Sequence, residues 1–301
     1  MKNSKLFIGV VCAIGAAVCY GTNPLARFLY AEGMNIPSVL FYRFGLAWVI
    51  VAAVMLFRHF GPSKESLRVN RREFLTLTAL GVLFILSSTT LYTSFALMPS
   101  GIASTILFTY PVMTAAIMAL FFREKVTLPV ISSIVLSFIG VALLSFNDDG
   151  ATFNLLGILL VLISALTYAL YIIVVDKSPL QMSSFKINFY VLFYCALGNV
   201  VYALVSGQPL LLPPSPTAWF WVGWLAVVPA IMALVMMVYA AKYLGSTPTA
   251  ILGALEPMTA VLIGVFVFAE PFSPRLLLGI VLILAAVTLV VLAKARRNAT
   301  T

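Results

Sequence analysis

Long apolar runs separated by short polar stretches cover nearly the whole chain. The runs occupy residues 6–30, 38–57, 74–97, 102–122, 129–146, 155–175, 185–205, 219–241, 249–268 and 276–293. Each run is 18 to 25 residues long, which is the length that an α-helix needs to cross about 30 Å of hydrocarbon. Lipid tolerates no unpaired backbone groups, and the strands of a barrel would be shorter and alternate in polarity. The pattern therefore predicts an all-α membrane protein with ten transmembrane helices.

The composition supports a membrane protein. Hydrophobic residues make up 62% of the chain and charged residues 9%, and the mean hydropathy is +1.11. A soluble domain is about 45–50% apolar and about 25% charged, so a water-soluble chain is excluded. The opening "MKNSKLFIGVVCAIGAAVCYG" has the positive start of a signal peptide, but its apolar run is too long and lacks a convincing cleavage site. We expect it to be a retained first helix.

The distribution of basic residues predicts the orientation. If the N-terminus is cytoplasmic, fifteen of the eighteen lysines and arginines fall in cytoplasmic loops and tails, and the exceptions are Arg27, Arg43 and Arg275. Short cytoplasmic loops carry such an excess, so both termini are predicted to be cytoplasmic. The net charge of +9 is then a signal of topology. We expect the most basic loop, "RHFGPSKESLRVNRRE", to be a solvated connector, and no nucleic-acid partner is predicted.

Several kinds of chemistry are excluded by what the sequence contains. The three cysteines show no CxxC spacing and there is a single histidine, so we expect no disulfide framework, metal site, haem or other cofactor. The P-loop pattern GxxxxGK[ST] does not occur, which excludes ATP hydrolysis by that route. A membrane enzyme would need paired catalytic groups at depth, whereas the deep ionisable residues are Glu256 and Arg43. We therefore predict a protein that is not an enzyme, with a passive channel as an alternative to a carrier.

The chain contains an internal repeat. A shift of 146 residues places Pro111 on Pro257, and a shift of 148 places Tyr20 on Tyr168. Residues 1–148 and 149–301 are thus predicted to be two copies of a five-helix unit. Because five is odd, the two copies are expected to be inverted relative to each other. Inverted repeats in secondary transporters place the substrate site between the halves and support alternating access.

At this point the motifs resemble a known family. "YGTNP", "FYRF", "IGVALLS" and the paired segments "YPVMTAAIMALFFREKVTLP" and "LEPMTAVLIGVFVFAEPFSP" resemble the EamA domain of the drug/metabolite transporter superfamily, repeated twice over nearly the whole chain. The resemblance implies a proton-coupled or facilitated carrier, monomeric or homodimeric, in the bacterial inner membrane. The family contains exporters of amino acids and other metabolites, and we expect this chain to export a small organic metabolite such as an amino acid. Uptake or exchange of a nucleotide-like, vitamin or cationic drug solute remains the alternative.

Residues three or four apart share a helix face, and this spacing selects the candidates for a central substrate site. Tyr20 and Asn23 share a face in the first helix, and Tyr168 and Tyr171 share one in the sixth. In the third helix we select Thr89 and Tyr92, because the internal repeat aligns them with Met236 and Tyr239 in the eighth helix. Tyr110 occupies the repeat position of Glu256. A pocket lined by tyrosine and methionine suits an amphipathic or aromatic solute.

Two charged residues complete the candidate set. Arg43 lies about 8 Å below the outer end of its helix, at about 1.5 Å per residue. It is expected either to extend to the interface or to bind a carboxylate or phosphate. Glu256 precedes Pro257 inside an apolar run and is expected either to bind a substrate ammonium or carry a coupling proton, or to fix helix packing. The two backbones are expected to be too far apart for an ion pair. We expect Glu124 and Glu270 to be structural groups at helix ends.

Overall fold

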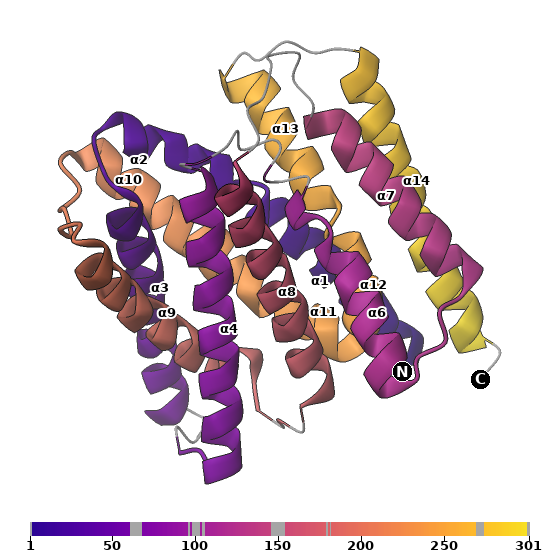
Figure 1. Cartoon of the computed structure of the whole chain (residues 1–301). Coiled ribbons are helices and arrows are strands. Elements are labelled where there is room, and N and C mark those ends of the chain that lie inside the picture. Colours follow the sequence, from indigo (N-terminus) through magenta and orange to yellow (C-terminus); the bar gives the residue numbers. More distant parts are fainter. Residues whose placement is uncertain are drawn as a thin grey trace.

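The computed structural model describes residues 2–60, 68–95, 97, 103, 106–145, 154–178, 180, 182–268 and 274–299, and the secondary structure of this part is helical. Figure 1 shows the helices packed side by side in one bundle. This confirms the predicted all-α class. The predicted boundary between residues 148 and 149, and Glu270, lie outside the described residues.

The first half of the chain contains α1 (Lys2–Tyr20), the 3₁₀ turn η1 (Asn23–Ala26), α2 (Arg27–Ala31), α3 (Ile36–Phe60), α4 (Arg71–Phe95), α6 (Tyr110–Phe122) and α7 (Leu128–Ser145). The second half contains α8 (Leu155–Lys177), α9 (Ser184–Ser206), α10 (Pro216–Leu225), the π-helical segment η2 (Ala226–Met232), α11 (Ala233–Leu244), α12 (Ser246–Leu252), α13 (Leu255–Phe268) and α14 (Pro274–Ala299).

Seven helical segments within the described residues are long and apolar enough to cross a membrane. They are Lys5–Ala31, Ile36–Phe60, Arg71–Ser94, Leu155–Lys177, Ser184–Ser206, Pro216–Leu244 and Ser246–Phe268. Shorter apolar helices cover Tyr110–Phe122, Leu128–Gly140 and Leu277–Ala286. The chain is therefore a multi-pass membrane protein, and the count of ten spans stays a prediction.

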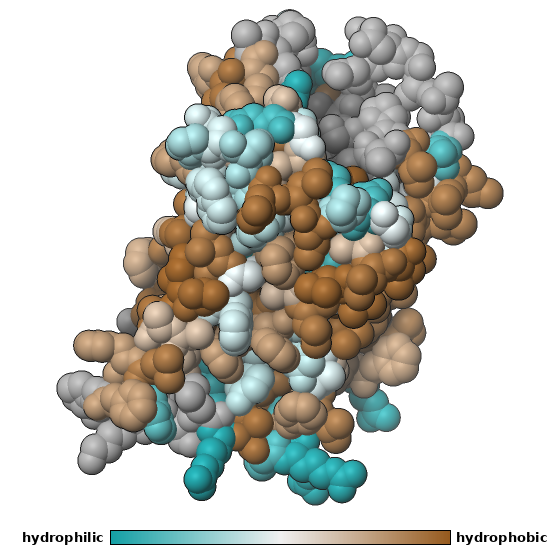
Figure 2. Space-filling view, turned by 90° about the vertical axis from the view of Figure 1, so that its left-hand side faces the viewer, coloured by the Kyte–Doolittle hydropathy of each residue, from teal (hydrophilic) through white to brown (hydrophobic). Residues whose placement is uncertain are grey.

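The core lies where the long helices pack on one another. The most extensive contacts join α7 to α14, α4 to α8, α3 to α9 and α1 to α11. Small residues such as Ala16, Ala165 and Ala241 are fully buried in these contacts and let the backbones approach closely. Figure 2 shows one face of the bundle, where hydrophobic residues cover much of the middle beside a paler band, and the largest group of strongly hydrophilic residues lies at the lower end. Such a surface suits contact with lipid tails.

One end of the bundle carries most of the basic side chains. At this end α3 ends with Arg58 and α4 begins with Arg71 and Arg72, and we call it the basic end. In Figure 1 it is the lower end, where α1 begins and α14 ends. The other end is called the opposite end below.

Among the described residues, four apolar segments depart from a regular α-helix. The first breaks after Tyr20, where Pro24 lies in a 3₁₀ turn. Pro229 interrupts another within the π-helical segment η2, because proline cannot donate the hydrogen bond of a regular turn. The turn at residues 253–254 separates α12 from α13, and a turn at residues 108–109 precedes α6. Figure 1 shows α6 and α13 beginning near the middle of the bundle and running toward opposite ends.

Candidate functional site

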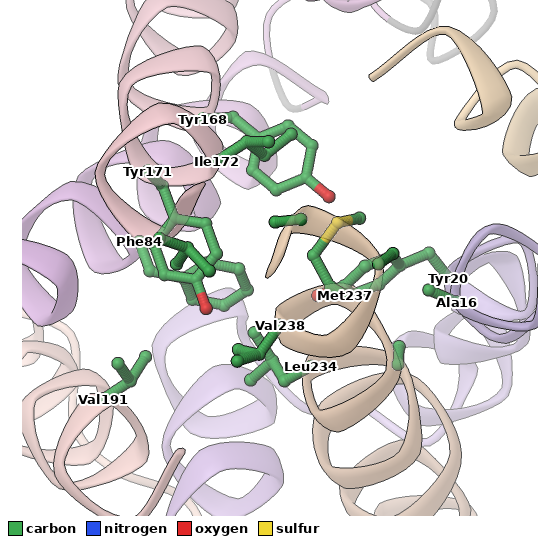
Figure 3. Packing of buried hydrophobic residues seen from close by; sticks show 14 of the residues in the cluster. Ala16, Tyr20, Phe84, Tyr168, Tyr171, Ile172, Val191, Leu234, Met237 and Val238 are labelled. Carbon is green, nitrogen blue, oxygen red and sulfur yellow. The ribbon is translucent and has the colours of Figure 1, made fainter. Parts of the chain in front are cut away.

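Aromatic side chains from different helices converge at the centre of the bundle. The rings of Tyr20 and Tyr168 lie 6.5 Å apart at 87°, and those of Tyr110 and Tyr168 lie 5.0 Å apart at 73°. The Tyr171 ring stacks parallel to Tyr168 at 6.3 Å, and Phe84 contacts Tyr171 at 5.1 Å. Figure 3 shows this convergence of side chains from α1, α4, α8 and α11. We call Tyr20, Tyr110, Tyr168 and Tyr171 the tyrosine cluster.

The cluster holds polar atoms that have no hydrogen-bond partner among the described residues. The hydroxyls of Tyr20, Tyr110 and Tyr171 are buried and unpartnered. The same holds for Oδ1 of Asn23 and Oγ1 of Thr89. Buried polar groups in proteins are usually hydrogen-bonded, so these groups are suited to receive a polar solute.

Glu256 lies in the first turn of α13, directly after the break that follows α12. It interacts electrostatically with Tyr20, Tyr110 and Tyr168 of the cluster, and also with Arg43. Protein atoms surround its side chain, which nevertheless keeps partial solvent access. Glu256 is thus neither sealed in the apolar core nor exposed on the outer surface.

Two glycines allow α13 and its break to lie against neighbouring helices. A methyl group added at Gly253 would overlap the hydroxyl of Tyr110. One added at Gly21 would lie 2.8 Å from the backbone carbonyl of Glu256 and would overlap Thr259. The absence of a side chain at both positions is what brings α6 and α1 close to Glu256.

Arg43 is buried, with 3% of its surface exposed, so it does not extend to the membrane interface. Its Nη1 donates to the Tyr92 hydroxyl at 3.0 Å, and its Nη2 donates to the carbonyl of Pro229 at 3.3 Å. The irregular backbone of the π-helical segment presents that carbonyl. Nε of Arg43 is buried and has no partner in the described part of the chain. No salt bridge joins Arg43 to Glu256 in the part of the chain that the structure describes.

Met236 and Tyr239 do not join the tyrosine cluster. A regular helix through Pro229 would place them on its central face, but the π-helical segment widens the turn and rotates everything after it. The sulfur of Met236 lies against Gly15 of α1, and the Tyr239 ring packs on Tyr243 at 5.8 Å. The central face of α11 instead carries Leu234, Met237 and Val238 (Figure 3).

Two residues in or beside the site, Met237 and Tyr30, were missed from the sequence. Met237 takes the place on the central face that was expected for Met236. Pro229 was the signal in the sequence, because a proline inside a helix marks a place where the regular turn is disturbed. Tyr30 on α2 interacts electrostatically with Tyr92 and Arg43. No spacing in the sequence marks Tyr30 as part of the site. Glu124, which we expected from the sequence to be a structural group at a helix end, accepts a 3.3 Å hydrogen bond from Thr247 there.

Comparison with known proteins identifies the family of this chain. The model of the EamA-like transporter family matches the chain twice, at residues 7–146 and 155–292. The chain belongs to the EamA-like transporter family. The resemblance seen in the motifs is thereby confirmed, and with it the prediction of a membrane transporter that is not an enzyme.

Curated relatives agree with this membership. An uncharacterized transporter of Archaeoglobus fulgidus is 27% identical over 279 residues, covering 93% of this chain and 94% of the relative. The uncharacterized transporter YyaM of Bacillus subtilis is 24% identical over 304 residues, covering 95% and 93%. A protein of known crystal structure is 17% identical, with a TM-score of 0.77 and coverage of 96% of this chain and 98% of that one. At this identity the solved structure supports the fold alone.

Proposed function

We propose that the protein is a secondary-active transporter that exports a small organic metabolite, such as an amino acid, by alternating access. The observation that carries the proposal is the position of Glu256, at a helix break and within electrostatic reach of three tyrosines of the cluster. An acid inside a membrane bundle is a functional candidate. Broken helices are where secondary transporters commonly bind solutes.

The chemistry of the centre fits a solute with an ammonium group. Glu256 supplies a carboxylate, and the faces of the tyrosine rings attract a cation. The hydroxyls of Tyr20 and Tyr110 are available as hydrogen-bond partners. Arg43 offers its unpartnered Nε to a carboxylate on the same solute. In this proposal the rings of Tyr168 and Tyr171 enclose an apolar or aromatic side chain.

The arrangement of the halves supports alternating access. α6 and α13 occupy corresponding places in the two repeats and run in opposite directions from the middle of the bundle (Figure 1). In the proposed ten-helix topology the repeats are inverted, the basic end faces the cytoplasm and both termini lie there, in the inner membrane of a bacterium. Rocking of one repeat against the other exposes Glu256 to each side in turn. Glu256 is also the proposed carrier of a coupling proton.

Counterflow in proteoliposomes tests the transport proposal. Vesicles preloaded with unlabelled amino acids, nucleobases or organic cations are diluted into each labelled counterpart. We expect saturable exchange of a zwitterionic amino acid that excess unlabelled solute competes away. Flux that never saturates would support a passive channel, and exchange restricted to organic cations would support the drug-carrier alternative.

A further inference from the structure

A polar contact at the basic end joins the last turn of α8 to the start of α12. Oδ2 of Asp176 accepts hydrogen bonds from the backbone nitrogen of Ser246 at 3.1 Å and from its hydroxyl at 3.0 Å. Hydrogen bonds to a carboxylate are stronger than neutral ones, and an anion at the start of a helix is favourable. Lys177 contacts the same oxygen at 3.3 Å but is exposed. The Asp176–Ser246 contact therefore ties together two spans that flank the tyrosine cluster.

Neighbouring contacts converge on the same corner between α11 and α12. Nζ of Lys242 donates to the carbonyls of Leu180 and Met182 at 3.2 and 3.1 Å. Thr247 donates to Glu124 at the end of α6 at 3.3 Å. Gly245 makes the corner with a φ of 92°, which a residue with a side chain rarely adopts. Residues 242–247 thus hold α6, α8 and the connection after α8 in place.

An apolar layer lies between this corner and the tyrosine cluster. Its side chains, each no more than 1% exposed, are Ile172, Val175, Leu244, Ile251 and Leu252. On the other side of the cluster the exposure rises. Asn23, Thr89 and Glu256 are each partly exposed as whole residues, although the side-chain oxygens Oδ1 of Asn23 and Oγ1 of Thr89 are buried, and Tyr30 is 37% exposed. The central site is therefore sealed toward the basic end.

We propose that the Asp176–Ser246 contact is the latch of a gate at the basic end, and that its release opens the central site toward that end. The proposal rests on the alternating-access function inferred above. In this structure the gate is closed: the latch holds the corner against α8, and the apolar layer beneath it excludes water and solute. When the latch releases, α12 and the corner move away from α8 and the layer separates.

Accessibility from the two sides tests the latch without any knowledge of the solute. The test uses the full chain, in which alanine replaces Cys12, Cys19 and Cys195 and a single reporter cysteine replaces Asn23. A membrane-impermeant maleimide is added to vesicles of either orientation. We expect Asn23→Cys to react mainly from the opposite end, and Asp176→Ala to raise its labelling from the basic end several-fold. Lys177→Ala, which leaves Ser246 bound to Asp176, is the matched control and is expected to change nothing.

Basic-end labelling that stays unchanged in a folded Asp176→Ala protein would overturn the latch. Folding is checked by unchanged labelling from the opposite end. A second arm links Asp176→Cys to Ser246→Cys, without the reporter, by a short thiol cross-linker that a reductant cleaves. Counterflow is expected to stop and to return on reduction, and flux that persists in the linked protein would also overturn the gate. If no solute shows counterflow even before linking, the transport proposal fails while the labelling arm still decides the gate.

Discussion

Nη1 of Arg43 donates a 3.0 Å hydrogen bond to the hydroxyl of Tyr92, and this contact joins α3 to α4 inside the bundle. The second donor of the guanidinium holds the Pro229 carbonyl at 3.3 Å. One arginine thus connects two helices of the first half to the irregular segment of the second. This placement gives Arg43 a structural task beside its proposed contact with a solute.

Tyr92→Phe is expected to destabilise the protein by about 1.5–3 kcal/mol, the range for a hydrogen bond to a charged group. The change removes one acceptor of Arg43 and preserves the ring. Thermal unfolding in detergent measures the loss. Tyr202→Phe is the control, because it removes a 3.0 Å hydrogen bond between two neutral hydroxyls, those of Tyr202 and Thr93, worth about 0.5–1.5 kcal/mol. Equal losses in the two variants would show that the charge of Arg43 is not engaged at Tyr92.

Glu256→Gln is expected to fold and insert normally but to lose substrate flux or its dependence on pH. Glutamine keeps the shape and hydrogen bonding of the side chain but cannot change its charge. Glu73→Gln, at the exposed start of α4 where the side chain accepts from the Asn70 backbone nitrogen, serves as the control and is expected to transport normally. Counterflow measured between pH 5.5 and 8 gives the readout. Full flux with an unchanged pH dependence in Glu256→Gln would leave only a packing role for this residue.

Gly253→Ala is expected to destabilise the protein, because the added methyl group overlaps the Tyr110 hydroxyl. Overpacking of this kind costs about 1–3 kcal/mol. Tyr110→Phe in the same chain removes the overlapping oxygen and is expected to restore part of the stability. At Gly223 an added methyl group meets nothing within 4 Å, so Gly223→Ala is expected to be neutral or slightly stabilising. Unfolding temperatures that are the same for the single and double variants would argue against the close contact.

Asn188→Leu is expected to raise the unfolding temperature. Asn188 is 0% exposed, and both polar atoms of its side chain lack a hydrogen-bond partner among the residues that the structure describes. Burying such unpaired groups costs about 1–3 kcal/mol. Asn199 is the comparison, because its Nδ2 donates to the Cys195 carbonyl at 2.8 Å while its Oδ1 is unpartnered. Asn199→Leu is therefore expected to gain less. A lower unfolding temperature for Asn188→Leu would show that its polar groups are engaged in the membrane.

Reporter fusions test the orientation. Fusions after Leu97, Phe146 and Gly207 are expected to read periplasmic, and fusions after Ser63, Glu124 and Lys294 cytoplasmic. The reason is the concentration of lysine and arginine on one side. A cytoplasmic signal after Gly207 would remove the inverted repeat and the proposed alternation of the two halves.

The helical class and the family were open to prediction from the sequence, because both depend on local composition and motifs. Runs of about 20 apolar residues form α-helices in lipid, because the backbone must satisfy its own hydrogen bonds there. The internal repeat also aligns Tyr110 with Glu256 and Tyr20 with Tyr168. Three members of the tyrosine cluster do lie within electrostatic reach of Glu256.

Only the tertiary structure decided which side chains meet across helices. The position of Arg43 along its helix would let the side chain extend to the membrane interface. Its hydrogen bonds to the Tyr92 hydroxyl and the Pro229 carbonyl instead hold it inside the bundle. The central face of α11 could not be read from a spacing of three or four residues, because the π-helical turn rotates it from Met236 to Met237. The contact of Asp176 with Ser246 joins residues 70 positions apart. Periodicity describes one regular helix at a time, whereas breaks in the helices and the packing between them determine where their faces point.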